Sequence, residues 1–185
     1  MGYAIDPHKS WLPLLAAADS EKDPRRAQLI REVAVHMETE ITGQLEPLMA
    51  TLTAEPVYHF WGNGQPMVLE GRETIRGFYA NMMAAGGQQF EVVVERVIAD
   101  TNHVVTEGRV KQVYRGTALR AMGVTEVGGT AVSDDSLWLS DAQLITVWPA
   151  DAAGKLIGED IYFGVEPMKT LKPITASDLP PYYVL

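Results

Sequence analysis

The chain contains no cysteine, which removes a whole class of chemistry from consideration. Among its 185 residues there can be no disulfide, no thiol nucleophile and no thiolate metal ligand. Basic clusters are missing as well, since Arg25 and Arg26 form the only adjacent pair of basic residues. Because the net charge is −9, the protein would repel a polyanion, and we expect no nucleic acid partner.

Long apolar runs are also absent. The longest is far shorter than the roughly 20 residues that span a bilayer, so we expect no membrane partner. The first residues lack the basic segment and apolar run of a secretory signal, which favours a cytoplasmic protein. With 46% hydrophobic and 21% charged residues, the composition is that of one globular domain, large enough to enclose a pocket.

Cofactor and metal motifs are missing too. The glycines at 62, 64, 86–87 and 128–129 have neither the Walker nor the dinucleotide spacing. The histidines, at positions 8, 36, 59 and 103, show no metal-ligand spacing, and no serine lies in a nucleophile elbow. We therefore expect no cofactor and no metal, which leaves chemistry that side chains can perform alone.

Hydrophobic periodicity predicts helices first and strands afterwards. Asp23 and Pro24 favour a helix start, and an apolar stripe continues from Ala27 to Ile41. The other predicted helices cover residues 45–52 and 72–85, and the predicted strands cover 57–61, 67–69, 90–99, 103–114, 137–148 and 156–163. This order predicts an α+β fold in which a curved sheet wraps around the helices.

Two stretches of this pattern resemble a known superfamily. HFWGNG followed by GRETIRGFYANM at residues 59–82, and GKLIGEDIYFG at residues 154–164, are similar to the ketosteroid isomerase branch of the SnoaL-like and nuclear transport factor two-like proteins. The resemblance covers residues 24–166 and implies a SnoaL-like cone, with a homodimer formed through the outer face of the sheet. Residues 1–22, 115–136 and 167–185 fall outside it, as an N-terminal extension, an insertion and a tail.

His59 is the main catalytic candidate. The resemblance places it where ketosteroid isomerases carry their general-base aspartate, on the strand that opens into the cavity. An imidazole, with an ordinary pKa of about 6.5, can accept a proton at neutral pH without further adjustment. The alternative is a structural histidine, satisfied by a backbone carbonyl.

Glu159 and Asp160 lie next to each other on the last strand and so face opposite sides of the sheet. If Phe163 faces the cavity, Glu159 faces it too, because the two residues are four apart on one strand. A bulge in the strand would instead turn Asp160 inward. Whichever carboxylate faces the cavity would hold the imidazole of His59. Gln143 lies near the isomerase oxyanion position, whose helix partner corresponds to Val35. The aspartate of limonene epoxide hydrolases is replaced by isoleucine at position 161, which argues against epoxide hydrolysis.

The predicted substrate-binding residues are aromatic and methionine side chains, each of which could equally be part of a packed core: Tyr58, Trp61, Phe78, Tyr79, Met82, Tyr114, Trp148 and Phe163. The resemblance and these residues predict a cofactor-independent lyase or isomerase that acts on a small hydrophobic, aromatic or polycyclic substrate. Dehydration, isomerisation and carbon–carbon cleavage such as deformylation all remain open. The alternative is a non-catalytic ligand-binding or assembly protein on the same fold.

Overall fold

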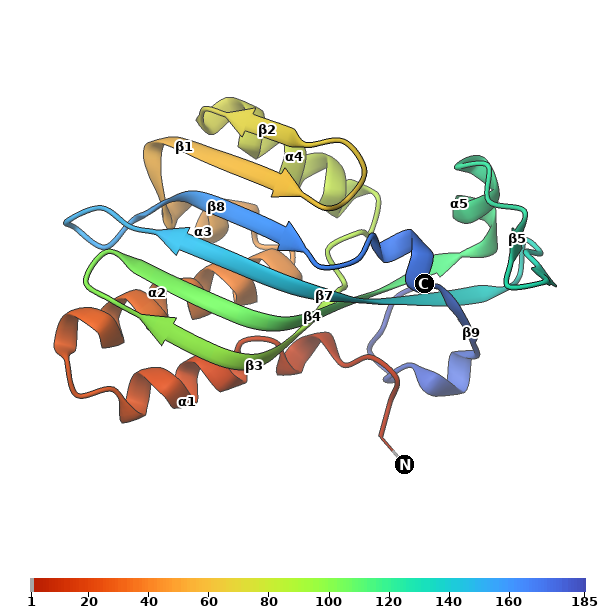
Figure 1. Cartoon of the computed structure of the whole chain (residues 1–185), viewed down its shortest axis with the longest axis horizontal. Helices are drawn as coiled ribbons and strands as arrows, with labels where there is room; N and C mark the ends of the chain where they lie inside the picture. Colours follow the sequence, from red (N-terminus) through yellow and green to blue (C-terminus); the bar gives the residue numbers. More distant parts are fainter. Residues whose placement is uncertain (1) are drawn as a thin grey trace.

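The computed structural model describes residues 2–185. The elements follow in the order η1 (Pro7–Lys9), α1 (Leu12–Ser20), α2 (Pro24–Ile41), α3 (Leu45–Ala50), β1 (Leu52–Trp61), β2 (Met67–Glu70), α4 (Arg72–Ala84), β3 (Glu91–Ala99), β4 (His103–Arg115), α5 (Gly116–Ala121), β5 (Glu126–Val127), β6 (Thr130–Ala131), β7 (Leu137–Pro149), β8 (Leu156–Phe163), η2 (Pro167–Thr170), β9 (Lys172–Ile174) and η3 (Ala176–Asp178) (Figure 1).

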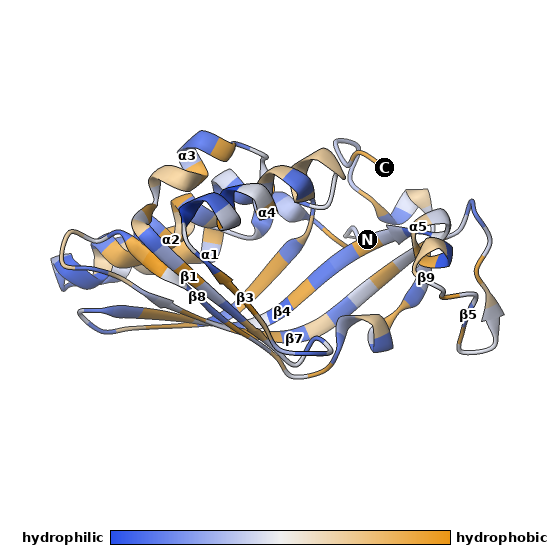
Figure 2. Cartoon of the chain, turned by 90° about the horizontal axis from the view of Figure 1, so that it is seen from above, coloured by the Kyte–Doolittle hydropathy of each residue, from blue (hydrophilic) through white to orange (hydrophobic). Residues whose placement is uncertain are grey.

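The main sheet has seven strands in the order β2-β1-β8-β7-β4-β3, with β9 paired to β7. β1 and β8 run parallel, and the other neighbours run antiparallel. The sheet bends beneath α1 to α4, which cover one of its faces (Figure 2). This open, curved, mixed sheet around N-terminal helices confirms the predicted α+β cone fold.

Local sequence signals explain where the main elements begin. At the start of α2, the Asp23 carboxylate accepts hydrogen bonds from the backbone N–H groups of Arg25 and Arg26 at 2.9 and 3.0 Å. In the β3–β4 turn, the Asp100 carboxylate accepts from the N–H groups of Asn102 and His103, each at 2.7 Å. The Asp23 cap confirms the predicted helix start.

β1 is longer than predicted. The preceding helix ends at Ala50, and the strand begins at Leu52 instead of residue 57. Pro56 lies within the strand, between the paired positions Leu52 and Val57, where the register with β8 shifts. A proline is tolerated there because it need not donate to a neighbouring strand.

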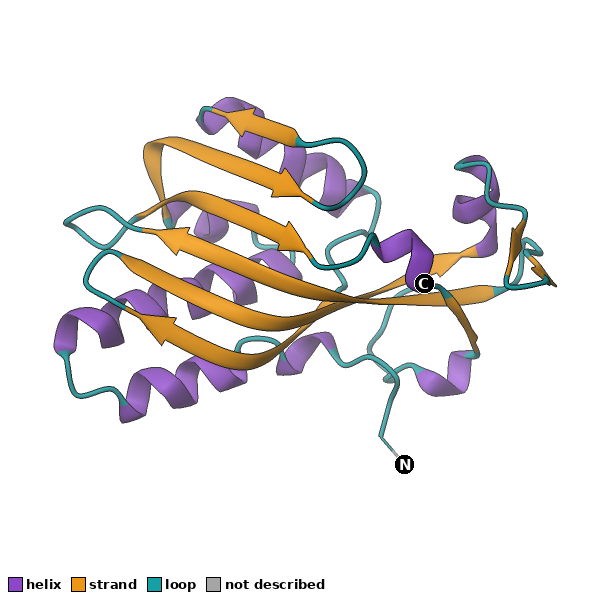
Figure 3. Cartoon of the chain, viewed as in Figure 1, coloured by secondary structure: helices purple, strands orange, loops and turns teal. Residues whose placement is uncertain are grey.

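The insertion and the tail are folded segments at one end of the sheet, where β4 and β7 extend beyond the helices (Figure 3). The insertion forms α5 and the β5–β6 hairpin, and its Leu119 and Val132 pack with Trp138. The tail forms η2, β9 and η3, and β9 lengthens the sheet by pairing with β7. No helix in the described range 2–185 is long and apolar enough to cross a membrane.

Candidate active site

A cavity of about 450 Å³ lies between the helices and the concave face of the sheet. Most of its wall is apolar. The predicted substrate-binding residues that line it are Tyr58, Phe78, Tyr79, Met82, Tyr114, Trp148 and Phe163. A volume of this size suits a small organic ligand.

His36 lies behind the cavity wall and is fully buried. Its Nδ1 atom is 2.6 Å from the Thr51 hydroxyl. Because Thr51 donates its own proton to the Leu48 carbonyl at 2.6 Å, its oxygen must accept from His36. The Nδ1 atom of His36 therefore carries a proton, and Nε2 is directed toward the cavity wall.

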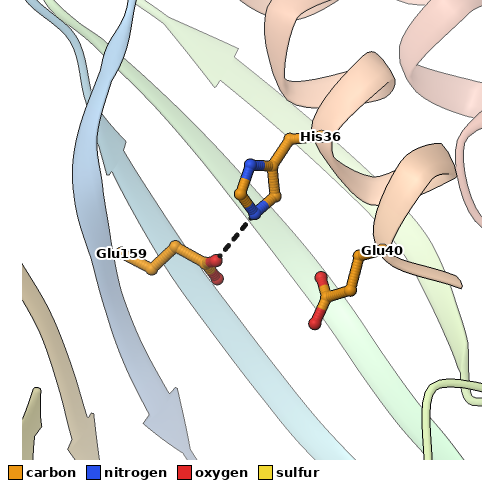
Figure 4. Close-up of side chains that lie close together, drawn as sticks. All are labelled: His36, Glu40 and Glu159. Atoms are coloured by element: carbon orange, nitrogen blue, oxygen red, sulfur yellow. Dashed lines mark hydrogen bonds and ion pairs between the residues drawn. The ribbon is translucent and has the colours of Figure 1, made fainter. Parts of the chain in front are cut away.

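Three oxygen atoms surround Nε2 of His36. The Glu159 carboxylate is 3.1 Å away, and the hydroxyls of Tyr79 and Tyr58 are at 3.2 and 3.3 Å. The Tyr79 hydroxyl is also 3.1 Å from the same Glu159 oxygen and 2.9 Å from the Tyr58 hydroxyl. Glu159, which lines the cavity, thus contacts the His36 ring (Figure 4) and also accepts a hydrogen bond from the Tyr79 hydroxyl.

Glu40 lies one helical turn after His36 on α2 and also lines the cavity. Figure 4 shows its carboxyl group turned toward the same space as that of Glu159. Burial raises the pKa of Glu40 well above its ordinary value of 4.5, and the nearby Glu159 raises it further. Both effects favour the neutral, protonated form of Glu40.

Tyr58 and Tyr79 remain phenols at neutral pH. Burial raises the pKa of each well above 10.0, and the charge of Glu159 adds to the effect because a phenolate beside it would be repelled. Both hydroxyls can therefore act as hydrogen-bond donors at this end of the cavity.

Gly158 allows β8 to approach β1 at this point. A Cβ atom there would lie 1.7 Å from the Val57 carbonyl oxygen, and its φ of +157° is seldom adopted by other residues. The close approach places Tyr58 beside Glu159 in the parallel pairing of the strands. The phenol and the carboxylate thus reach the cavity from neighbouring strands.

His59 does not face the cavity, so its predicted placement is wrong. Tyr58 and Phe60 line the cavity, and side chains alternate along a strand, which puts His59 on the outer face with 35% of its side chain exposed. Its ring stacks on Trp61, which also points outward and does not line the cavity. The resemblance identified the correct strand, but the alignment of the isomerase base with His59 is shifted by one residue along it.

The inward carboxylate was expected to hold His59, and this expectation is wrong: the outward Asp160 holds the ring, with its carboxylate 2.7 Å from Nδ1. The pair lies on the outer face, whereas Glu159 faces inward as the alternation argument predicted. Gln143 is exposed on β7 and does not line the cavity, because its neighbours Ala142 and Leu144 are the inward residues. Its predicted role as an oxyanion donor has no geometric basis.

Glu40 was not among the predicted site residues, and His36 had no predicted role. The two are four residues apart, which places them on the same face of a helix. The resemblance aligned the isomerase tyrosine with Val35, which is 42% exposed, one residue before the buried His36. The helical spacing of this histidine and glutamate, on the inward face of α2, is the sequence pattern that could have identified both as site residues.

These residues also include donor atoms that a metal ion could bind. Atoms of His36, Glu40 and Glu159 lie within 4.8 Å of one another. In the structure, Nε2 of His36 also contacts two phenols and the Glu159 carboxylate.

The fold and the site define a cone-shaped α+β protein with an acid–base cluster at one end of an apolar cavity. The chain belongs to the SnoaL-like domain family, whose model matches residues 33–131. No curated protein matches it.

Solved structures of similar fold include an enzyme described as the epoxide hydrolase/cyclase-like SalBIII, which acts in pyran ring formation in the polyether salinomycin. It has 12% identity and a TM-score of 0.54 over 79% of this chain and 95% of that one. An M. tuberculosis epoxide hydrolase of the LEH-like type has 19% identity and a TM-score of 0.55 over 80% and 91%. An NTF2-like protein from Anabaena variabilis has 12% identity and a TM-score of 0.55 over 80% and 96%. At these identities the similarity establishes the fold alone.

Proposed function

We propose that this protein is a cofactor-independent acid–base enzyme that acts on a small hydrophobic substrate in the cavity. The observation that carries the proposal is the pair of cavity-facing carboxyl groups, Glu40 and Glu159, which have different surroundings. Burial favours the neutral form of Glu40, whereas Glu159 accepts a hydrogen bond from the Tyr79 hydroxyl and lies 3.1 Å from Nε2 of His36. Carboxyl groups in unequal environments are a common arrangement for an acid and a base in one site.

Glu159 is the proposed base. It would remove a proton from a carbon next to a substrate carbonyl, or from a hydroxyl group. His36 does not line the cavity and acts as a positioning residue, since the Thr51 bond fixes its ring and directs Nε2 at Glu159. A proton taken up by Glu159 can be shared with Nε2, which keeps the base ready for the next transfer.

Glu40 is the proposed acid. As a neutral carboxylic acid it can donate a hydrogen bond to the substrate oxygen as negative charge develops there, or protonate a leaving hydroxyl group. The phenols of Tyr58 and Tyr79 line the same region and provide further donors. Together these groups support isomerisation or loss of water, and carbon–carbon cleavage would use the same proton transfers.

The test is hydrogen exchange from carbon acids. Neutral aromatic and polycyclic ketones are incubated with the protein in deuterium oxide, and deuterium uptake is followed by mass spectrometry. Glu159→Gln should slow the exchange by about 100- to 10,000-fold, the usual contribution of acid–base catalysis. Asp160→Asn is the matched control, because it removes the adjacent carboxylate on the outer face and should leave the rate unchanged.

Exchange that survives Glu159→Gln would contradict the proposal. A protein that binds these ketones tightly, with no exchange in any variant, would instead be the non-catalytic ligand-binding protein of the alternative hypothesis. Binding is measured in the same samples by calorimetry, so that the two results are obtained together.

We also propose that the outer face of the sheet pairs with a second copy of the chain. On this face, the His59 and Trp61 rings are stacked at 5.1 Å and the Trp61 and Tyr162 rings at 4.6 Å, while Val68 is 50% exposed. Exposed apolar groups that are this close together favour an interface. Sedimentation equilibrium should give a dimer at micromolar concentration, and a monomer would remove this proposal.

A further inference from the structure

The cavity has a second polar region, distant from the carboxyl pair. Gln112 on β4 and Ser140 on β7 lie directly opposite each other in the sheet. Both line the cavity, as does Tyr114, which is two residues beyond Gln112 on the same face. The cavity therefore has hydrogen-bonding groups at both of its ends.

The strand register gives the separation between the two regions. Asp160 pairs with Val147, so Glu159 lies level with Trp148. Ser140 is eight residues before Trp148 on β7. At about 3.3 Å per residue, the two levels are roughly 26 Å apart along the strand, and the side chains reach inward from both ends. An elongated ligand could contact both.

The far groups are incompletely satisfied by the protein. The Tyr114 hydroxyl is 3.5 Å from Gln112 Oε1, at the limit of a hydrogen bond, and the Ser140 hydroxyl is 3.4 Å from the Gln112 carbonyl oxygen. The Gln112 amide has a shorter bond, to the Gly87 carbonyl at 2.9 Å, and Ser140 also hydrogen-bonds to the Tyr114 hydroxyl. Burial raises the pKa of the Tyr114 hydroxyl, which therefore remains a neutral donor.

The wall around this region comes from segments outside the predicted core. Met122, which follows α5, and Pro167 and Met168 of η2 line the cavity there. The cavity lining contains no lysine or arginine among the described residues, and its ionisable carboxyl groups are Glu40 and Glu159. A carboxylate or phosphate would lack a counter-charge, so the site favours an uncharged group.

We propose that Gln112, Tyr114 and Ser140 form a second binding subsite, which anchors a neutral hydroxyl or carbonyl group at the far end of an elongated apolar substrate. The subsite deepens the proposed function, since the near end of that substrate would lie between Glu40 and Glu159. The insertion and the tail then contribute to specificity by closing the wall around the far end.

The experiment compares rigid, rod-shaped probes by calorimetry. They are the para-quaterphenyl with a hydroxyl group at each end, which is long enough to reach both regions, the same rod with a single terminal hydroxyl group, and the rod with one terminal hydroxyl and one terminal carboxylate group. In the wild type, the diol should bind about tenfold more tightly than the mono-hydroxyl compound, as expected for one or two additional hydrogen bonds. The carboxylate should bind more weakly than the diol.

Tyr114→Phe should weaken binding of the diol about fivefold, because one donor is lost. Thermal unfolding checks that the variant is folded, and the long contact to Gln112 predicts little change in stability. Tyr162→Phe on the outer face is the matched control and should leave the affinity of the diol unchanged.

Diol binding that is unaffected by Tyr114→Phe would overturn the subsite, as would a wild type that does not bind the diol or prefers the carboxylate. These results concern binding alone. Failure of the acid–base proposal would show separately, as exchange that survives Glu159→Gln.

Discussion

Glu40→Gln should stabilise the protein at neutral pH, and the gain should grow as the pH rises. The pKa of Glu40 is raised in the folded protein by burial and by Glu159, whereas the unfolded chain ionises near 4.5. Between these two pKa values the folded state keeps a proton that the unfolded state releases. The contribution of Glu40 to the stability of the wild type is therefore greatest below 4.5 and declines as the pH rises toward the folded pKa.

The size of the effect follows from linkage. When the folded state holds one proton that the unfolded state has released, the unfolding free energy falls by at most about 1.4 kcal/mol for each pH unit above the unfolded pKa. Glutamine has nearly the same shape as glutamic acid but cannot ionise. The difference in unfolding free energy between Glu40→Gln and the wild type should therefore increase with pH by up to this amount per unit. It should become constant once Glu40 ionises in the folded protein.

The assay is urea unfolding of both proteins at a series of pH values from 4.5 to neutral. Glu38→Gln is the control, because it removes a carboxylate from the same helix without altering the cavity wall. A difference that stays constant with pH, or shrinks, would show that Glu40 ionises normally. It would then be unable to act as a neutral acid, and the proposed division of roles with Glu159 would fail.

Substitutions at three further positions test the supports of the site and the role of His59. Thr51→Val should lower the unfolding free energy by about 1–3 kcal/mol, because it leaves the buried Nδ1 proton of His36 without an acceptor; Thr51→Ser should retain most of the stability in the same urea assay. Gly158→Ala should cost more than about 1 kcal/mol, since its Cβ would meet the Val57 carbonyl at 1.7 Å, and an unchanged urea midpoint would refute the close approach. His59→Ala should leave ketone exchange unchanged, and a large loss of exchange would restore the role that the sequence suggested.

Much of the fold could be predicted from local chemistry. The Asp23 cap, the Asp100 turn and the alternating strands act within a few residues, so the sequence carries them directly. The start of β1 was missed because it depends on pairing with β8 about 100 residues later, where a register shift accommodates Pro56. Local patterns contain no information about such a shift.

The site was predicted less well, for a geometric reason. The inward facing of Glu159 followed correctly from the alternation of side chains, counted from Phe163. Because side chains alternate, an alignment error of one residue on β1 assigns a side chain to the wrong face of the sheet. Such an error led to His59 being expected in the cavity, whereas it lies on the outer face. His36 and Glu159 are 123 residues apart in the chain, and only the packing of α2 against the sheet brings them together.

That separation also determines when the site can exist during folding. The groups that surround Glu159 come from α2, β1 and α4, all in the first half of the chain, whereas Glu159 lies on the last long strand. Contacts between distant parts of a chain close large loops and form slowly. A nascent chain released from the ribosome only as far as β7 would contain most of the cavity wall but not Glu159. Recovery of the proposed ketone exchange on refolding should therefore lag behind the formation of helices and report the docking of β8.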